Sequence, residues 1–319
     1  MSDESPQRDT ESIRKGRDVR IVIGGASGFL GTALSEYLIG RGDDVVHLVR
    51  RAAAVDQEVQ WDPAAGSVDL AVLEGADAVV NLGGVGIGDS RWSEDRKEAI
   101  LQSRLQATAT LAAAISSLST PPRVFVSASA IGFYGDRGDE TLTEQSNPGP
   151  ESDFLVQVAK RWEEAALPVV AAGVPLAFLR TGIVLGDGGV LSRLLLPFKV
   201  GVGGPMGSGK QWWSWITLED QVRATVHIID RRLSGAFNLT APNPVRNKEF
   251  AKSLGRALHR PALLPVPAFS LKALLGAGRA QALVFTSARI LPQALKSSGF
   301  QFTHESLESA WPAVLGKGA

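Results

Sequence analysis

The stretch Val19-Arg-Ile-Val-Ile-Gly-Gly-Ala-Ser-Gly-Phe-Leu-Gly31 indicates the fold class of this chain. Its first five residues are mostly β-branched and apolar, which predicts a buried parallel strand. Gly25, Gly28 and Gly31 follow with the spacing G-x-x-G-x-x-G, and residues 32–39 have the apolar spacing of a helix. A strand, a glycine turn and a helix in this order place a pyrophosphate at the helix N-terminus. We therefore expect a dinucleotide-binding turn, and a purely structural turn is the alternative.

The end of the second expected strand indicates which dinucleotide is bound. The apolar run over residues 44–49 is followed by Arg50 and Arg51, where an NAD site would have a carboxylate for the adenosine ribose. A guanidinium suits a 2′-phosphate instead, because its planar fork donates two parallel hydrogen bonds. We expect NADP(H), with Arg50 as the main contact because it comes first after the strand. The alternative is a solvated pair of surface arginines.

Composition excludes several classes of function. The chain has 319 residues, is 44% hydrophobic and 21% charged, and has no formal net charge, so its electrostatics favour neither nucleic acid nor an anionic membrane. It has no long apolar run that would predict a membrane span. Cysteine is absent, which excludes disulfides and thiolate chemistry, and the four histidines show no metal-ligand spacing. We expect a small-molecule substrate and no metal, nucleic acid or membrane partner.

Later segments continue to alternate between strand and helix patterns. Strands are expected over residues 77–82, 123–127 and 176–180, and helices over residues 93–118 and 154–172. Regular alternation of this kind is typical of α/β proteins. The sequence therefore predicts a Rossmann-type, doubly wound parallel sheet.

The two ends of the chain differ from this pattern. Residues 1–18 are polar and lack the apolar core of a secretory signal, so we expect a disordered leader and a cytoplasmic protein. Residues 19–182 form the expected NADP-binding domain. Residues 183–319 are richer in loops and prolines, which favours a smaller C-terminal α/β substrate domain, with residues 212–240 returning to the sheet. The chain is expected to be a monomer or a homodimer.

Several longer motifs resemble a known family. Residues 24–31, 81–84 and 127–135 together resemble an extended short-chain dehydrogenase/reductase of the NAD(P)-dependent epimerase/dehydratase type. Residues 180–186 and 203–211 are similar to an atypical subgroup of it. This subgroup is the sugar-epimerase-like family that includes human short-chain member 39U and division-associated proteins. The resemblance implies a Rossmann fold, an NADP cofactor and an activity of the epimerase or oxidoreductase type.

The resemblance also implies a set of NADP contacts. They lie in the glycine turn, after three strands and on the long helix: Gly25, Ser27, Gly28, Phe29, Leu30, Gly31, Val49, Arg50, Leu82, Gly83, Arg104 and Val184. Leu82 and Gly83 are expected at a strand C-terminus, where ligand crevices open. Arg104 is a cation that would face the cofactor phosphates, and a surface charge on an amphipathic helix is the alternative.

The proton-transfer pair of this superfamily is missing. Its members use a Tyr-x-x-x-Lys pair, in which the lysine lowers the pKa of the tyrosine. This chain has only two tyrosines, Tyr37 and Tyr134, and neither has a lysine four residues later. In the helix that should carry the pair, Phe154 and Leu155 are expected near the tyrosine position and Lys160 near the lysine position.

Two residues remain as catalytic candidates. Ser129 is expected where the superfamily has its serine, and Tyr134 could donate a proton from the following loop. The alternatives are a strand-end serine bonded to the backbone and a half-buried anchoring tyrosine. Lys160 and Glu163 are most simply charges on a helix surface.

A glycine-rich segment further on resembles a phosphate-binding loop only in its spacing. Residues 204–210 match G-x-x-x-x-G-K, but Gln211 replaces the Ser or Thr that would hold magnesium, and no strand precedes the segment. We expect a loop that flanks the substrate cleft. At least two of the neighbouring tryptophans Trp212, Trp213 and Trp215 are expected in the core.

Together these features predict an NADP(H)-binding, epimerase/dehydratase-like oxidoreductase that acts on a small polar substrate, such as a sugar-like one. Because the Tyr-x-x-x-Lys pair is missing, a non-catalytic NADP(H)-binding regulatory or scaffold protein, associated with cell division, is the alternative.

Overall fold

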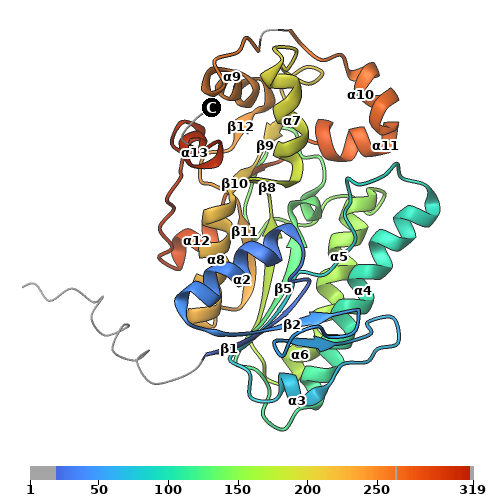
Figure 1. The fold of residues 1–319 in the computed structure, drawn as a ribbon. Coiled ribbons are helices and arrows are strands. Elements are labelled where there is room, and N and C mark those ends of the chain that lie inside the picture. Colours follow the sequence, from blue (N-terminus) through green and yellow to red (C-terminus); the bar gives the residue numbers. More distant parts are fainter. Residues whose placement is uncertain (1–18, 263, 317–319) are drawn as a thin grey trace, which may run out of the picture.

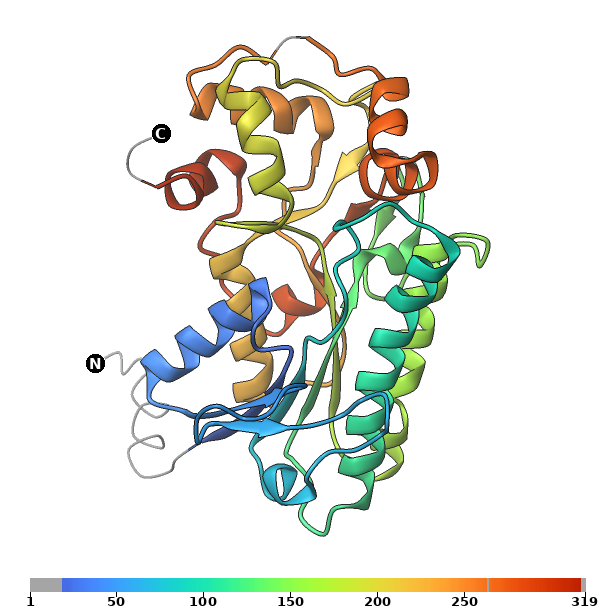
Figure 2. The same cartoon turned by 45° about the vertical axis from the view of Figure 1, so that its right-hand side comes forward.

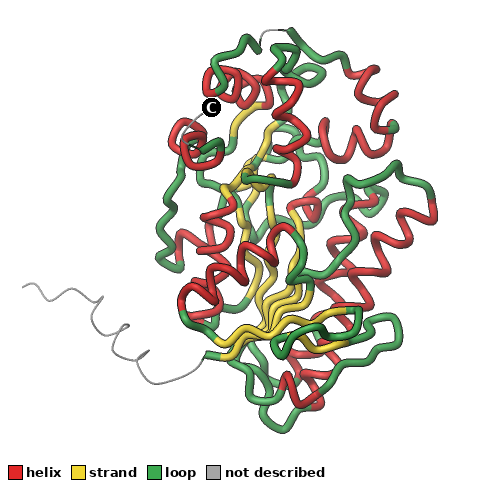
Figure 3. Tube along the Cα trace, viewed as in Figure 1, coloured by secondary structure: helices red, strands yellow, loops and turns green. Residues whose placement is uncertain are grey.

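A seven-stranded sheet with the order β11-β7-β5-β4-β1-β2-β3 forms the centre of the computed structural model, which describes residues 19–262 and 264–316. In sheet order the strands are β11 (Gly235–Leu239), β7 (Leu176–Thr181), β5 (Phe125–Ala130), β4 (Ala78–Asn81), β1 (Arg20–Gly24), β2 (Asp44–Val49) and β3 (Glu58–Gln60). Every neighbouring pair is parallel, and the strands run side by side through the middle of Figure 3. The predicted α/β, doubly wound sheet is confirmed. The predicted leader over residues 1–18 lies outside the described residues.

Helices cover both faces of this sheet. In Figure 1, α2 (Phe29–Arg41) and α8 (Leu218–Arg231) lie on one face, and α4 (Glu94–Ser117) and α5 (Phe154–Ala166) lie on the other. Each face has its own apolar core, because alternate residues of a strand point to opposite faces. Ile21 packs in one core and Val22 in the other. The parallel sheet is therefore buried on both sides.

Local sequence signals explain where the helices begin and end. The side chain of Ser93 accepts a hydrogen bond from the Arg96 N–H at the start of α4. The helix expected over residues 154–172 is instead two helices, α5 and the short α6 (Pro168–Ala171). Proline lacks an N–H and fits the first position of a helix, so Pro168 begins a new helix and does not continue α5.

The region after β7 builds a smaller layer at one end of the sheet (Figure 2). It has its own apolar core. Its main elements are β8 (Ile183–Leu185), α7 (Gly189–Lys199), β9 (Trp212–Trp213), β10 (Trp215–Thr217), β12 (Val245–Arg246), α9 (Asn247–Ala257), α10 (Ala268–Leu275), α11 (Ala277–Ala280), η2 (Gln281–Phe285) and α13 (Leu307–Val314). The remaining short elements are α3 (Leu70–Leu73), η1 (Ile131–Tyr134), β6 (Thr141–Leu142), β13 (Arg289–Ile290) and α12 (Gln293–Ser297).

Two elements of the later sequence return to the central sheet. Strand β11 pairs with β7 at the sheet edge, and α8 packs against the same core as α2. Within the described ranges, none of the helices combines the length and the apolar character needed to cross a membrane.

Candidate functional site

The glycine turn that follows β1 lies in close contact with the end of β4 and with the first turn of α2. Gly25 has φ +82°, and a Cβ built on it would lie 2.7 Å from the backbone N of Gly83. A Cβ on Gly31 would lie 2.2 Å from the carbonyl oxygen of Gly25. Any larger residue at either position would therefore force backbone segments apart. These two glycines let the turn pass directly over the end of β4 and let α2 pack on it.

Gly28 has a different role in the same turn. It is the N-cap residue of α2, has φ −81°, is exposed, and supplies no side-chain cap. A Cβ built on it would approach only one atom within 4 Å, the Gly25 carbonyl oxygen at 3.3 Å. The first turn of α2 therefore faces open space with its amide groups uncapped by any side chain, which is the arrangement that receives a phosphate. Ser27 is exposed beside it, and Phe29 and Leu30 begin the helix.

The two arginines after β2 are not equivalent. Arg51 donates hydrogen bonds to both carboxylate oxygens of Glu58, one of them at 2.6 Å, and this contact lowers the pKa of Glu58 to about 2. Arg50 is exposed and has no hydrogen bond or ion pair to any residue in the described ranges. Because Arg51 is already paired, Arg50 is the guanidinium at this strand end that is free to bind a phosphate.

Leu82 and Gly83 follow β4 directly, and Arg104 lies against the next residue, Gly84. Arg104 reaches across from α4 and donates through one nitrogen, Nη1, to the carbonyl oxygens of Val85 and Ile100, at 3.0 and 2.9 Å. Among the described residues no carboxylate pairs with it, and burial lowers its pKa to about 10. A partly buried cation with no carboxylate partner among the described residues is suited to an anionic or strongly polar ligand. Arg104 is therefore not a surface charge, as the alternative had it.

A cavity of about 210 Å³ opens beside Arg104, at the carboxyl ends of β5 and β7. Leu155 and Ala159 of α5, one helical turn apart, line it together with Gly132 and Trp162. Arg104 is the sole titratable side chain among the residues that line this cavity. The predicted cofactor residues thus lie together at the carboxyl ends of strands β1, β2, β4 and β7. Val184 lies on the same edge and packs against the same core cluster as Leu82.

Lys160 does not face this cavity. Its side chain is partly exposed and its ammonium pairs with Glu151, which agrees with a charge on the helix surface. Leu155 and Ala159 line the cavity, and Ala159 comes one residue before Lys160. Because a helix turns about 100° per residue, the Lys160 side chain points well away from the direction of Ala159. Leu155 and Ala159 have the spacing of a Tyr-x-x-x-Lys pair, but both of their side chains are apolar.

Ser129 and Tyr134 lie in a buried polar network and not in the cavity wall. The Ser129 hydroxyl donates to Glu163 at 2.7 Å, and Glu163 accepts two hydrogen bonds from Arg180, at 2.8 and 2.9 Å. The Tyr134 hydroxyl is 0% exposed, donates to Asn238 and accepts from Arg180. Burial raises the pKa of Tyr134, although Arg180 opposes this. Glu163, expected on the helix surface, is therefore a buried partner of Arg180.

The tryptophan segment divides as expected. Trp213 and Trp215 belong to the apolar core of the C-terminal layer, which confirms that at least two of the three are core residues, and Trp212 lines the cavity. Gln211 is buried and donates to two backbone carbonyls. Its side chain therefore ties the glycine-rich loop to the backbone of Met206 and Val284.

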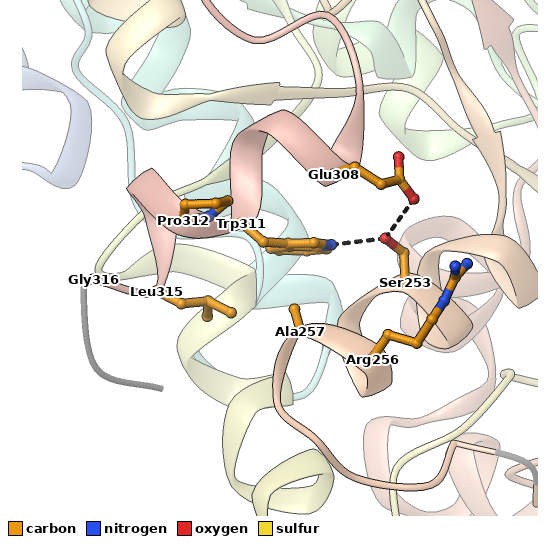
Figure 4. Close-up of a pocket in the computed structure, with 8 residues that line it drawn as sticks. All are labelled: Ser253, Arg256, Ala257, Glu308, Trp311, Pro312, Leu315 and Gly316. Atoms are coloured by element: carbon orange, nitrogen blue, oxygen red, sulfur yellow. Dashed lines mark hydrogen bonds between the residues drawn. The ribbon is translucent and has the colours of Figure 1, made fainter.

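Two other hollows lie away from the strand ends. One, of about 470 Å³, is lined by Lys210, Arg246 and Lys248. The other, of about 350 Å³, lies between α9 and α13, and Figure 4 shows its Ser253 hydroxyl bonded to both Glu308 and Trp311. Those polar groups are satisfied by one another. In the part of the chain that the structure describes, no cluster of His, Asp or Glu could hold a metal ion.

Comparison with known proteins agrees with this arrangement. The chain matches the model of the NAD dependent epimerase/dehydratase family over residues 21–239, and that of a domain of unknown function, DUF1731, over residues 266–311. An epimerase family protein of Mycobacterium leprae is 40% identical over 296 residues, which cover 92% of this chain and 95% of that protein. The human epimerase family protein SDR39U1 is 34% identical over 305 residues, which cover 93% of this chain and 100% of that protein.

Solved structures give the same picture. The crystal structure of human SDR39U1 (isoform 2) with NADPH superposes with a TM-score of 0.83 at 32% identity and covers 92% of this chain and 98% of that chain. A nucleoside-diphosphate sugar epimerase of Corynebacterium glutamicum superposes with a TM-score of 0.77 at 34% identity, over 97% of this chain and 60% of that one. The chain belongs to the NAD dependent epimerase/dehydratase family, and its near relatives are the epimerase family proteins of the SDR39U1 type.

Proposed function

We propose that this protein binds NADP(H) along the carboxyl ends of β1, β2 and β4 and uses it for hydride transfer to or from a small molecule in the cavity beside Arg104. Two groups at these strand ends carry the proposal: the start of α2 at Gly28, which has no side-chain cap, and the guanidinium of Arg50, which has no partner among the described residues. The NADPH in the human relative's crystal structure supports it.

Three of the predicted cofactor positions have a specific role in this proposal. The amides that follow Gly28 receive the pyrophosphate, and Arg50 receives the 2′-phosphate of the adenosine ribose. Arg104, which lies against Gly84 and lines the cavity, offers its remaining N–H groups to a ligand. The bound cofactor supplies the hydride chemistry, and the protein supplies position and electrostatics.

A non-catalytic, NADP(H)-binding regulatory protein is the second candidate. The observation that favours it is the composition of the cavity wall, in which Leu155 and Ala159 occupy the i, i+4 positions and no carboxylate, histidine or tyrosine is present. A general acid contributes about 10²–10⁴ in rate, and this wall offers none of the usual ones. Steady-state kinetics with a panel of carbonyl compounds separate the candidates, because measurable NADPH oxidation contradicts the non-catalytic one.

Calorimetric titration with NADPH and NADH tests the cofactor. Loss of the charge-assisted phosphate contact in Arg50→Ala is expected to cost about 1.5–3 kcal/mol of NADPH binding, or about 10- to 150-fold in Kd, and to change NADH binding little. Arg51→Ala is the matched control, because Arg51 is already paired with Glu58, and it should leave both affinities near wild type. Equal losses for NADPH and NADH in Arg50→Ala would refute the 2′-phosphate contact.

The remaining expectations from the sequence stay proposals. We propose a small-molecule substrate, no nucleic-acid or membrane partner, and a cytoplasmic location. Ser129 and Tyr134 are proposed as positioning residues: their network holds the end of β5 against α5 and so shapes the cavity wall at Gly132 and Leu155.

A further inference from the structure

The cavity beside Arg104 has walls of an unusual kind for a sugar site. Three tryptophans and several aliphatic residues form most of its surface, among them Trp162, Trp212, Trp213, Leu155 and Leu283. Its lining contains no Asp, Glu, His, Asn or Gln. A sugar carries a hydroxyl on nearly every carbon, and each one loses free energy on burial unless it finds a hydrogen-bond partner.

The few polar side chains in the wall already donate their hydrogens to protein atoms. The Ser214 hydroxyl donates to the Ala288 carbonyl oxygen at 2.8 Å, and the Thr286 hydroxyl donates to that of Gln281 at 3.0 Å. Thr181 donates to the Leu179 carbonyl oxygen in the same way. These hydroxyls are thereby held by the backbone, and none is left to donate to a polyol.

The indole N–H groups are also occupied. Trp162 donates to Thr108 at 2.9 Å and Trp212 donates to Asp139 at 3.1 Å, so neither of these indole N–H groups is available to a ligand. Arg104 lies over the Trp162 ring, 4.9 Å from its centroid, and Arg246 and Arg289 lie over the Trp212 ring at 4.2 and 4.8 Å. The wall therefore offers a ligand mostly apolar contact.

Arg104 supplies the one available strong donor. Its Nη1 is used by two backbone carbonyls, whereas Nε and Nη2 have no hydrogen-bond partner among the described residues. With no carboxylate to neutralise it, this guanidinium can donate to a single oxygen of a molecule in the cavity.

We propose that the cavity takes a planar, conjugated carbonyl compound of apolar surface, such as a quinone, with one carbonyl oxygen on Arg104, and that it excludes sugars. This substrate class rests on the NADP(H)-binding function proposed above. NADPH would be oxidised to NADP⁺ as its hydride adds to the conjugated system; the carbonyl oxygen takes the negative charge, and a proton from water neutralises it. A conjugated oxyanion is stable enough to form without a lysine-activated tyrosine, which fits the absence of one here.

Binding of 1,4-naphthoquinone tests the proposal without relying on turnover. Titration followed by calorimetry and by quenching of tryptophan fluorescence is expected to show saturable binding, with UDP-glucose giving none. Ala282→Phe fills the cavity from its C-terminal wall and should weaken naphthoquinone at least tenfold. Ala277→Phe, at an exposed position on the neighbouring helix α11, is the matched control and should bind as wild type does.

A second variant keeps the test decisive if Ala282→Phe does not fold. Leu283→Ala removes a wall contact without adding bulk and should weaken naphthoquinone several-fold. Unchanged naphthoquinone affinity in the folded cavity variants, or saturable binding of UDP-glucose in the cavity, would overturn the proposal.

Binding of the cofactor and binding of naphthoquinone are expected to be independent of each other. Naphthoquinone affinity should be the same with and without saturating NADP⁺, and naphthoquinone should accelerate NADPH oxidation above the rate without protein. Competition between the two, or turnover of a UDP-sugar in place of the quinone, contradicts the substrate class. Failure of NADPH to bind while naphthoquinone still binds would instead contradict the proposed function, so the two failures are distinguishable.

Discussion

Two polar regions lie at the carboxyl ends of the strands, one after β1 and β2 and the other after β5 and β7. They differ in how many of their polar groups are already hydrogen-bonded within the protein. At the ends of β1 and β2, the start of α2 has no side-chain cap and Arg50 has no partner among the described residues. At the ends of β5 and β7, Ser129, Glu163 and Arg180 bond to one another out of reach of solvent. Buried polar groups that are satisfied internally support the fold, whereas unsatisfied ones at an open edge are available for a ligand.

The largest effect on NADPH binding is expected when a side chain blocks the start of α2. Gly28→Val should abolish measurable NADPH binding and leave the protein folded, because φ −81° is allowed for valine and the side chain enters the open space before α2. Calorimetry measures binding and circular dichroism measures folding. Gly40→Val, near the other end of α2 where a Cβ meets nothing within 4 Å, is the control. Normal NADPH affinity in Gly28→Val would remove the cofactor from this turn.

The second region should respond in stability and not in cofactor affinity. Glu163→Gln leaves Arg180 as a buried cation without a charged partner and should lower the free energy of unfolding by about 3–5 kcal/mol. Urea denaturation measures this loss, and NADPH affinity of the folded fraction should stay near wild type. A stable Glu163→Gln protein that binds NADPH poorly would show that the network belongs to the cofactor site.

Tyr134→Phe should have a smaller effect of the same kind. It removes the hydroxyl that bridges Asn238 and Arg180, and the expected loss is about 1–3 kcal/mol of unfolding free energy. Any NADPH oxidation should continue, because the tyrosine does not line the cavity. Loss of turnover without loss of stability would restore Tyr134 as a proton donor.

The pH dependence of stability gives a finer test of the same residue. Burial raises the pKa of Tyr134, so the folded state holds this proton more tightly than the unfolded state does. The linked stability is present below the ordinary tyrosine pKa of about 10 and is lost as the pH rises through the folded value. As the pH rises above about 10, the free energy of unfolding should therefore fall more for the wild type than for Tyr134→Phe. Urea denaturation at successive pH values measures this difference.

The smallest effect is expected for Lys160→Ala. This ammonium is exposed and pairs with Glu151 on the surface of α5, so neither NADPH affinity nor turnover should change. A marked loss of turnover would show that the lysine reaches the site after all.

The sequence by itself determined the sheet and the glycine turn, and it predicted the cofactor site at the strand ends, because these depend on local patterns. Apolar runs of strand length, glycines at fixed spacing and arginines directly after a strand act within a few residues of one another. The break at Pro168 was also readable from proline chemistry, although the expected helix ran through it.

Only the tertiary structure decided which polar groups are free. Arg50 and Arg51 are neighbours in sequence, but only the approach of β3 places Glu58 against Arg51. From its position on α5, Glu163 was expected on the helix surface, but Arg180 of β7 lies against it and bonds to it. Arg180 stands inside an apolar strand, and this was a signal in the sequence that it has a buried acidic partner. Pairing of this kind joins residues far apart in the chain, and no local pattern carries that information.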